Sequence, residues 1–249
     1  MDKPIIEVCV DTVESALAAQ AGGADRVELC DNLWEGGTTP SAGAIALARE
    51  HLRIKLQVII RPRGGDFLYT DLEFAIMQRD IKVAKELGAD GVVIGLLTAD
   101  GEVDAPRVAQ LMELARPLSV TFHRAFDVAR DPFAALETLI SLGVDRVLTS
   151  GQEESVALGV DLLAELVRRA GERIIIMPGG GFNERNIARI VAQTGAREAH
   201  VTGFANTESG MRHRNERVFM GGTLRPPEYV RAVTDAGVIA SLRQAVSGE

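Results

Sequence analysis

The chain has 249 residues, 46% of them hydrophobic and 25% charged, and its formal net charge is -8 at pH 7. This size and composition suffice for the core of one α/β barrel, and the acidic balance argues against a nucleic-acid binder, which needs a basic face. No apolar run reaches the roughly 18 residues that cross a membrane, and the first residues have no signal-peptide pattern. We therefore expect a cytoplasmic protein that binds neither nucleic acid nor membranes.

Short apolar segments alternate with helical segments along the whole chain. Strands are predicted at 4–10, 25–30, 56–61, 91–95, 118–123, 145–150, 173–177 and 198–202. The helices that follow them are predicted at 13–21, from Ser41, at 72–87, at 105–115, from Asp131, at 155–170, at 183–194 and at 227–246, the last after a long polar loop at 203–225. Eight such repeats in this length predict a TIM (β/α)8 barrel over 1–249, as a single domain.

The pattern Glu-X-Cys occurs twice, as Glu7-Val-Cys9 in the first predicted strand and Glu28-Leu-Cys30 in the second. Residues two apart in a strand share a face, so each glutamate points the same way as its cysteine. If the two strands are neighbours, two carboxylates and two thiols meet inside the protein. Buried charge is costly unless it is paired or used, so the pattern indicates either an ion-pair network or a functional site.

Active sites of TIM barrels lie at the carboxyl ends of the strands, where this sequence places many polar residues. The candidates for proton transfer are Glu7, Glu28 and His123. The candidates for binding an anion are Arg61, Arg63, Arg124 and the turn Gly179, Gly180 and Gly181. We expect Arg61 and Arg63 to pair with the two glutamates, and we interpret His200 as a satisfied interior histidine. None of the four lysines lies at such a strand end, which argues against a Schiff-base aldolase.

Several long motifs resemble those of the CutC copper homeostasis family. They lie at 7–11, 22–32, 35–41, 60–67, 121–127 and 148–152, and the resemblance runs from residue 5 to about 223. It implies a TIM barrel, a cytoplasmic location, a link to copper tolerance, binding of Cu(I) and a homo-oligomer, either a dimer or a tetramer. The cysteines proposed as copper ligands in the family fall on Cys9 and Cys30. The resemblance implies no catalysed reaction.

Two functions follow from these residues. In the first, the protein acts in copper homeostasis and binds Cu(I), a soft ion that prefers thiolates, through Cys9 and Cys30, with no organic cofactor. Against this, Glu7 and Glu28 are expected to raise the thiol pKa values by like-charge repulsion. In the alternative, the barrel mouth holds a small phosphorylated or carboxylated ligand, as the substrate of an isomerase, epimerase or lyase or as the ligand of a non-catalytic binding protein.

Overall fold

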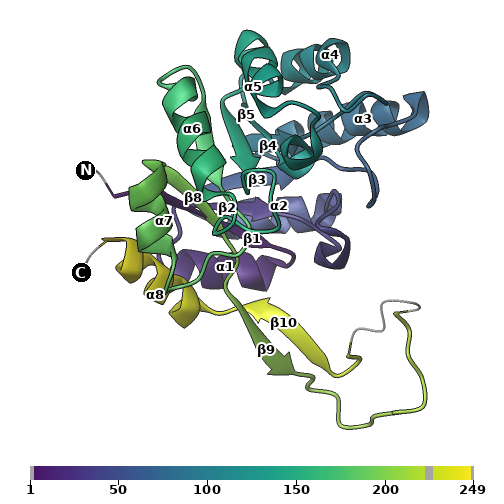
Figure 1. Ribbon diagram of the computed structural model, residues 1–249. Helices are drawn as coiled ribbons and strands as arrows, with labels where there is room; N and C mark the ends of the chain where they lie inside the picture. Colours follow the sequence, from purple (N-terminus) through teal and green to yellow (C-terminus); the bar gives the residue numbers. More distant parts are fainter. Residues whose placement is uncertain (1–2, 222–226, 248–249) are drawn as a thin grey trace.

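Eight parallel strands form the centre of this computed structural model, which describes residues 3–221 and 227–247 (Figure 1). They are β1 (Ile5–Val10), β2 (Arg26–Leu29), β3 (Lys55–Ile59), β4 (Gly91–Ile94), β5 (Ser119–Phe122), β6 (Arg146–Thr149), β7 (Ile175–Pro178) and β8 (Glu198–Val201). Each strand pairs with the next in the chain from β1 to β7, and β1 also pairs with β8. A bridge between Gly179 and His200 joins the ends of β7 and β8, so the ring is nearly closed. The TIM barrel predicted from the sequence is confirmed.

Helices surround this barrel. They are α1 (Val13–Ala21), α2 (Ala42–His51), α3 (Asp71–Glu86), α4 (Ala105–Ala115), α5 (Pro132–Ser141), α6 (Val160–Ala170), α7 (Ile187–Thr194) and α8 (Ala236–Ser247), with short 3-10 turns at Leu33–Glu35 and Arg124–Val128. Side-chain caps fix several starts; the Thr70 hydroxyl, for example, accepts from Glu73 N, and the Glu73 carboxylate accepts from Thr70 N. Among the described residues, no helix is both long enough and apolar enough to cross a membrane.

Alternation along the strands separates two kinds of side chain. On β1, Ile6, Val8 and Val10 are fully buried in the main apolar core, which includes the inner faces of the helices. The residues between them, Glu7 and Cys9, face the inside of the barrel, where they contact side chains of β2 and β8. The face assignment made from the sequence is therefore confirmed. The barrel interior is unusually polar, because charged side chains replace the branched apolar layers that commonly fill such a barrel.

The chain after β8 differs from the prediction. Residues Phe204–Glu208 (β9) pair antiparallel with Val230–Thr234 (β10), and this hairpin projects away from the barrel (Figure 1). The predicted loop at 203–225 is therefore partly strand, and residues 222–226 lie outside the described part of the chain. Because 230–234 are held in the hairpin, the last helix begins at Ala236 and not at 227. The helices predicted to start at 155 and 183 also start later, after turns in which Val156 N donates to Gly180 O and Asn183 N to Asn186 Oδ1.

Candidate functional site

Arginines and glutamates alternate in an ion-pair network across the barrel interior. The Arg26 guanidinium contacts both Glu7 and Glu198, and Arg146 Nε lies 2.9 Å from Glu198 Oε2. All four side chains are buried. Burial alone would raise the pKa of Glu7, but Arg26 and His200 together lower it to about 2, so Glu7 is ionised at neutral pH. Alternating charges of this kind compensate one another, which makes their burial tolerable.

The cations expected to neutralise the glutamates are not the ones that do so. Arg63 lies 2.6 Å from Glu73 Oε1 and 3.0 Å from Asp66 Oδ1, away from the barrel interior. Arg61 donates to backbone carbonyls and has no carboxylate within 4 Å among the described residues. The prediction that both pair with Glu7 and Glu28 was wrong. The physical reason is position along the barrel: β3 ends at Ile59, so Arg61 and Arg63 lie in the loop beyond it, whereas Arg26 on β2 lies directly beside Glu7 and neutralises it.

His200 on β8 links the network to the cysteines. Its Nδ1 lies 2.8 Å from Glu7 Oε1, and its Nε2 lies 3.6 Å from Glu28 Oε2. Burial would lower the pKa of His200, but Cys9, Glu7 and Glu28 outweigh this and raise it well above its usual value. The imidazole is therefore a buried cation at neutral pH. It does more than fill space as an interior histidine, because its charge lies beside both members of the repeated motif.

The two thiols lie side by side at the carboxyl ends of β1 and β2. Cys9 Sγ is 3.7 Å from Cys30 Sγ, and a carboxylate oxygen of Glu28 lies with both sulfurs in a buried cluster whose atoms are all within 4.8 Å of one another. A hydrogen bond from Cys30, helped by His200, lowers the pKa of Cys9 to about 6. The hydrogen bond to Cys9 and burial raise the pKa of Cys30 well above its usual value. The like-charge repulsion expected from the sequence thus does not decide the state of Cys9.

Glu28 behaves differently from Glu7, although both belong to the same motif. Burial, and then the negative charge of Cys9, raise the pKa of Glu28 well above its usual value. Burial and Cys9 thus favour the protonated form of Glu28, whereas Glu7 is ionised, because Arg26 contacts Glu7 and not Glu28. The site accordingly places a thiolate, an imidazolium and a neutral carboxyl group next to one another. Groups of this kind can bind a soft cation or transfer protons.

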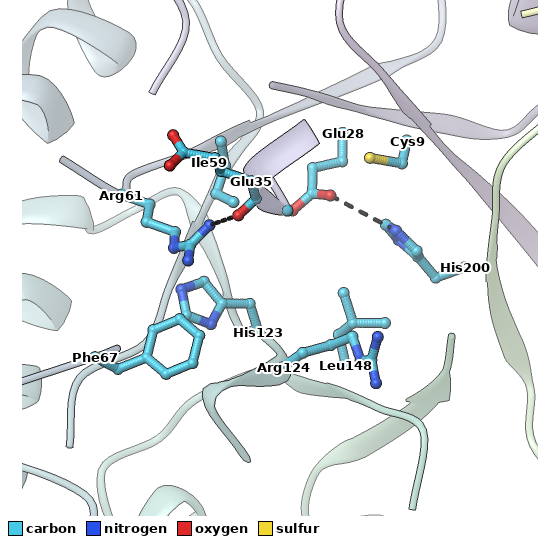
Figure 2. Close-up of a pocket in the computed structure, with 11 residues that line it drawn as sticks. Cys9, Glu28, Glu35, Ile59, Arg61, Phe67, His123, Arg124, Leu148 and His200 are labelled. Atoms are coloured by element: carbon cyan, nitrogen blue, oxygen red, sulfur yellow. Dashed lines mark hydrogen bonds and ion pairs between the residues drawn. The ribbon is translucent and has the colours of Figure 1, made fainter. Parts of the chain in front are cut away.

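A cavity of about 200 Å³ opens at this end of the barrel. It is lined by Cys9, Glu28, Glu35, Gly36, Ile59, Arg61, Phe67, His123, Arg124, Leu148 and His200. Figure 2 shows Arg61, Phe67 and His123 on one side of it and Cys9 and His200 on the other. Of the residues proposed from the sequence, the structure therefore brings Cys9, Glu28, His123, Arg61 and Arg124 to one cavity.

Other proposed residues lie away from this cavity. Glu7 lies deeper in the barrel, in the ion-pair network, and Arg63 points toward the start of α3. Gly179, Gly180 and Gly181 are not among the lining residues, and α7 begins only at Ile187. A Cβ on Gly179 would lie 2.9 Å from His200 Cβ, so Gly179 gives that side chain room. We therefore assign Gly179 a packing role where β7 meets β8.

Arg124 has a fixed position at the cavity rim. Its Nε donates to Asp127 Oδ2 at 2.6 Å, and its NH2 group donates to Ser150 Oγ at 2.7 Å. Asp127 in turn accepts from Ser150 N at 3.0 Å. The Arg124 guanidinium also lies against Gly180, where a Cβ would be 3.3 Å from Arg124 NH1. Arg124 thus already has a carboxylate partner, which Arg61 lacks.

Sequence reasoning missed Arg26, Arg146 and Glu198 and gave His200 no role in the site. A signal was present, since Arg26 lies two residues before Glu28 and Glu198 lies two residues before His200. Extending the same-face rule backward along each strand would have placed both inside the barrel. The alternation along each strand does not reveal the contact of β8 with β1. That contact brings His200 to Glu7, which lies 193 positions away in the sequence.

Known proteins resemble this chain over most or nearly all of its length. The CutC family model matches residues 4–205. A family protein CutC of Bacteroides thetaiotaomicron is 54% identical over 247 residues, which cover 99% of both chains. A human protein named copper homeostasis protein cutC homolog is 51% identical over 238 residues, which cover 96% of this chain and 87% of the human one.

Solved structures also share the barrel fold. The CutC crystal structure from Streptococcus agalactiae superposes with a TM-score of 0.76 and 39% identity, covering 79% of this chain and 97% of the other. The N-(5'-phosphoribosyl)anthranilate isomerase of Pyrococcus furiosus superposes with a TM-score of 0.59 at 12% identity, covering 99% of this chain and 100% of the isomerase. At that identity the second likeness concerns the barrel fold alone.

Proposed function

Since the chain belongs to the CutC family, whose human relative is named a copper homeostasis protein, we propose that it binds Cu(I) through Cys9 and Cys30. The observation that carries this proposal is the 3.7 Å separation of the two sulfur atoms at the barrel mouth. Cu(I) is soft and prefers thiolate ligands, and sulfurs this close can reach one ion. The Cys9 and Cys30 sulfurs can therefore form such a site by themselves.

The surroundings of the sulfurs fit this ion. Cys9 already favours the thiolate, and Cys30 supplies a second sulfur once its proton leaves. Two thiolates and one Cu(I) carry a net charge of -1, and the His200 imidazolium beside Cys9 compensates that charge. Cys9 also lines the cavity, which gives an ion from solution a way in. Glu28, which is neutral, adds no further negative charge.

We further propose that the protein works in the cytoplasm. Binding through two thiolates requires both cysteines in the reduced state, and the reducing cytoplasm maintains that state. Both cysteines are free thiols in the structure. The proposal rests on this chemical requirement, and fractionation of cells that express the protein from its own promoter tests it.

An anaerobic competition titration against a Cu(I)-specific chromophoric chelator tests the copper proposal. We expect one Cu(I) per chain for the wild type. Cys9→Ser and Cys30→Ser should each weaken binding by more than about 100-fold, since even the outer partners of a metal ligand are worth about 10- to 100-fold. The control is Met177→Leu, which removes another interior sulfur that already contacts Arg26 at 3.2 Å. Unchanged affinity in both serine variants would end the cysteine-site proposal.

Catalysis at the same mouth is the second candidate, as an isomerase, epimerase or lyase. The observation that favours it is a thiolate, an imidazolium and a protonated carboxyl group in one cavity, since proton transfer needs a base and an acid within reach of one substrate. The test is a screen of small hydroxy and keto acids for deuterium uptake from solvent. Uptake lost in Cys9→Ser would support it, and no uptake into any acid that binds would contradict it.

A further inference from the structure

Beyond copper, we propose that the cavity at the barrel mouth is a binding site for a small monocarboxylate, whose oxygens are held by Arg61 and His123. The proposal does not depend on an ion at the cysteines. It rests on two buried donor groups that lack partners, on the charge that one of them carries, and on the size and lining of the space in front of them.

Arg61 is a buried cation without a buried anion. Its side chain donates from NH1 to the carbonyls of Glu35 at 2.7 Å and Gly37 at 2.8 Å, and from NH2 to the carbonyl of Gly65 at 2.9 Å. Its Nε has no hydrogen-bond partner, although the Tyr69 hydroxyl lies near this side chain, and among the described residues Arg61 forms no ion pair with a carboxylate. The residue is only 5% exposed. A buried charge without a counter-ion is costly, so the site favours an anion from solution.

His123 supplies a second donor of defined direction. Its Nδ1 accepts a hydrogen bond from Ala125 N at 3.0 Å, which fixes the ring proton of the neutral imidazole on Nε2. That Nε2 is buried and has no partner. Burial and the nearby charge of Arg61 lower the pKa of His123 to about 3, so the ring stays neutral. Gly95 makes room for the ring, because a Cβ there would overlap it.

These groups lie on the same wall of the cavity. The Phe67 ring centroid is 5.0 Å from the His123 ring centroid and 5.2 Å from the Arg61 Cζ atom (Figure 2). Most of the remaining lining surface is apolar, with Ile59 and Leu148, and Cys9 lies on the far side together with Glu28 and His200 (Figure 2). A carboxylate placed between Arg61 and His123 would therefore direct its short apolar part along this lining toward the thiol.

Size and charge narrow the class of ligand. The cavity of about 200 Å³ is smaller than the roughly 300–1,000 Å³ of pockets that hold drug-sized ligands, so it favours a smaller molecule. One unpaired positive charge and two unpaired N–H groups match one carboxylate. A phosphate dianion would bring a second negative charge, and the other arginine of the lining, Arg124, is already paired with Asp127. We therefore infer a small acid with one carboxylate and few carbons.

Propanoate and its neutral isostere propanamide test this proposal, with inorganic phosphate as the competing class. We expect millimolar propanoate to raise the melting temperature of the full-length protein and to show saturable binding by calorimetry, whereas propanamide does neither. Arg61→Gln should weaken propanoate binding at least tenfold. Arg63→Gln is the matched control, because Arg63 follows the same strand but pairs with Glu73 outside the cavity, and it should bind like the wild type.

Two results of these measurements would overturn the proposal. One is an equal response to the acid and the amide, and the other is a loss in Arg63→Gln as large as that in Arg61→Gln. Phosphate binding more tightly than propanoate would overturn the monocarboxylate assignment. Each outcome is independent of copper, so failure here leaves the cysteine site standing, and failure of copper binding leaves this site standing.

A labelling experiment on the wild type covers the case in which Arg61→Gln does not fold. Iodoacetate carries a carboxylate and iodoacetamide does not, and both alkylate a thiolate with loss of iodide. We expect iodoacetate to modify Cys9 faster than iodoacetamide does, and propanoate to slow the iodoacetate reaction. Peptide mapping by mass spectrometry gives both rates. Faster reaction with the amide, together with no protection by propanoate, would contradict a carboxylate site in front of Cys9.

Discussion

Replacing Arg26 by glutamine tests the ion-pair network that supports the site. Removing one partner of a buried pair costs about 3–5 kcal/mol. Each glutamate that Arg26 contacts keeps a second partner, His200 at 2.8 Å for Glu7 and Arg146 at 2.9 Å for Glu198, so we expect about 3 kcal/mol. The pKa of Glu7 is consistent with this order of magnitude, because the difference between 4.5 and about 2 corresponds to about 3 kcal/mol, which Arg26 shares with His200 and Arg146.

Urea unfolding of Arg26→Gln against the wild type measures this loss. The control is Arg197→Gln, which removes an exposed pair with Glu172 and should leave the stability close to that of the wild type, because solvent screens such a pair. The pKa of Glu7 is lowered in the folded state, so its contribution is fully present above pH 4.5 and is lost as the pH falls through about 2. The difference between wild type and Arg26→Gln should therefore shrink over that range. A loss below about 1 kcal/mol at pH 7, or a difference independent of pH, would refute the reasoning.

Three further outcomes follow from the site and from the hairpin. Iodoacetamide should alkylate Cys9 with a midpoint near pH 6, because Cys30 and His200 stabilise the Cys9 thiolate. Cys30 should react only at higher pH, and a midpoint near 9 for Cys9 would be inconsistent with this reasoning. The NMR signals of the His123 ring should not titrate between pH 5 and 8, since burial and a nearby guanidinium keep its pKa at about 3, and a titration near 6.5 would contradict this. Because Val218, Phe219 and Met220 are all exposed on the connection between β9 and β10, we expect this apolar run to contact a second copy of the chain. Light scattering should then show a homo-oligomer that Phe219→Asp weakens, and a wild type with the mass of one chain would contradict it.

Periodicity in the sequence was sufficient to predict the barrel and the inward faces of its first two strands. Glu7 and Cys9 alternate with fully buried Ile6 and Val8, and this two-residue period alone determines which side chains face inside. The same argument correctly made neighbours of Cys9 and Cys30, because consecutive strands of a barrel pair in parallel. Local pattern and global fold agree at these positions, so reading the pattern was enough.

The chemistry of the site needed contacts that periodicity does not contain. Glu7 and Glu28 occupy equivalent motif positions, but one is ionised and the other is neutral, because the Arg26 side chain turns toward β1. Arg61 and Arg63 look equivalent in sequence, and only the folded loop shows that Arg63 has carboxylate partners while Arg61 has carbonyls. Differences of this kind depend on side-chain direction, which sequence spacing does not determine.

X-ray absorption at the copper edge of protein loaded anaerobically with one equivalent of Cu(I) tests the central proposal most directly. The proposed site predicts two sulfur ligands per copper in the wild type. Cys9→Ser and Cys30→Ser should each lose one sulfur from that shell, whereas Met177→Leu should leave the shell unchanged. A wild-type spectrum dominated by nitrogen or oxygen ligands, or one that both serine variants reproduce, would contradict a copper site at these two cysteines.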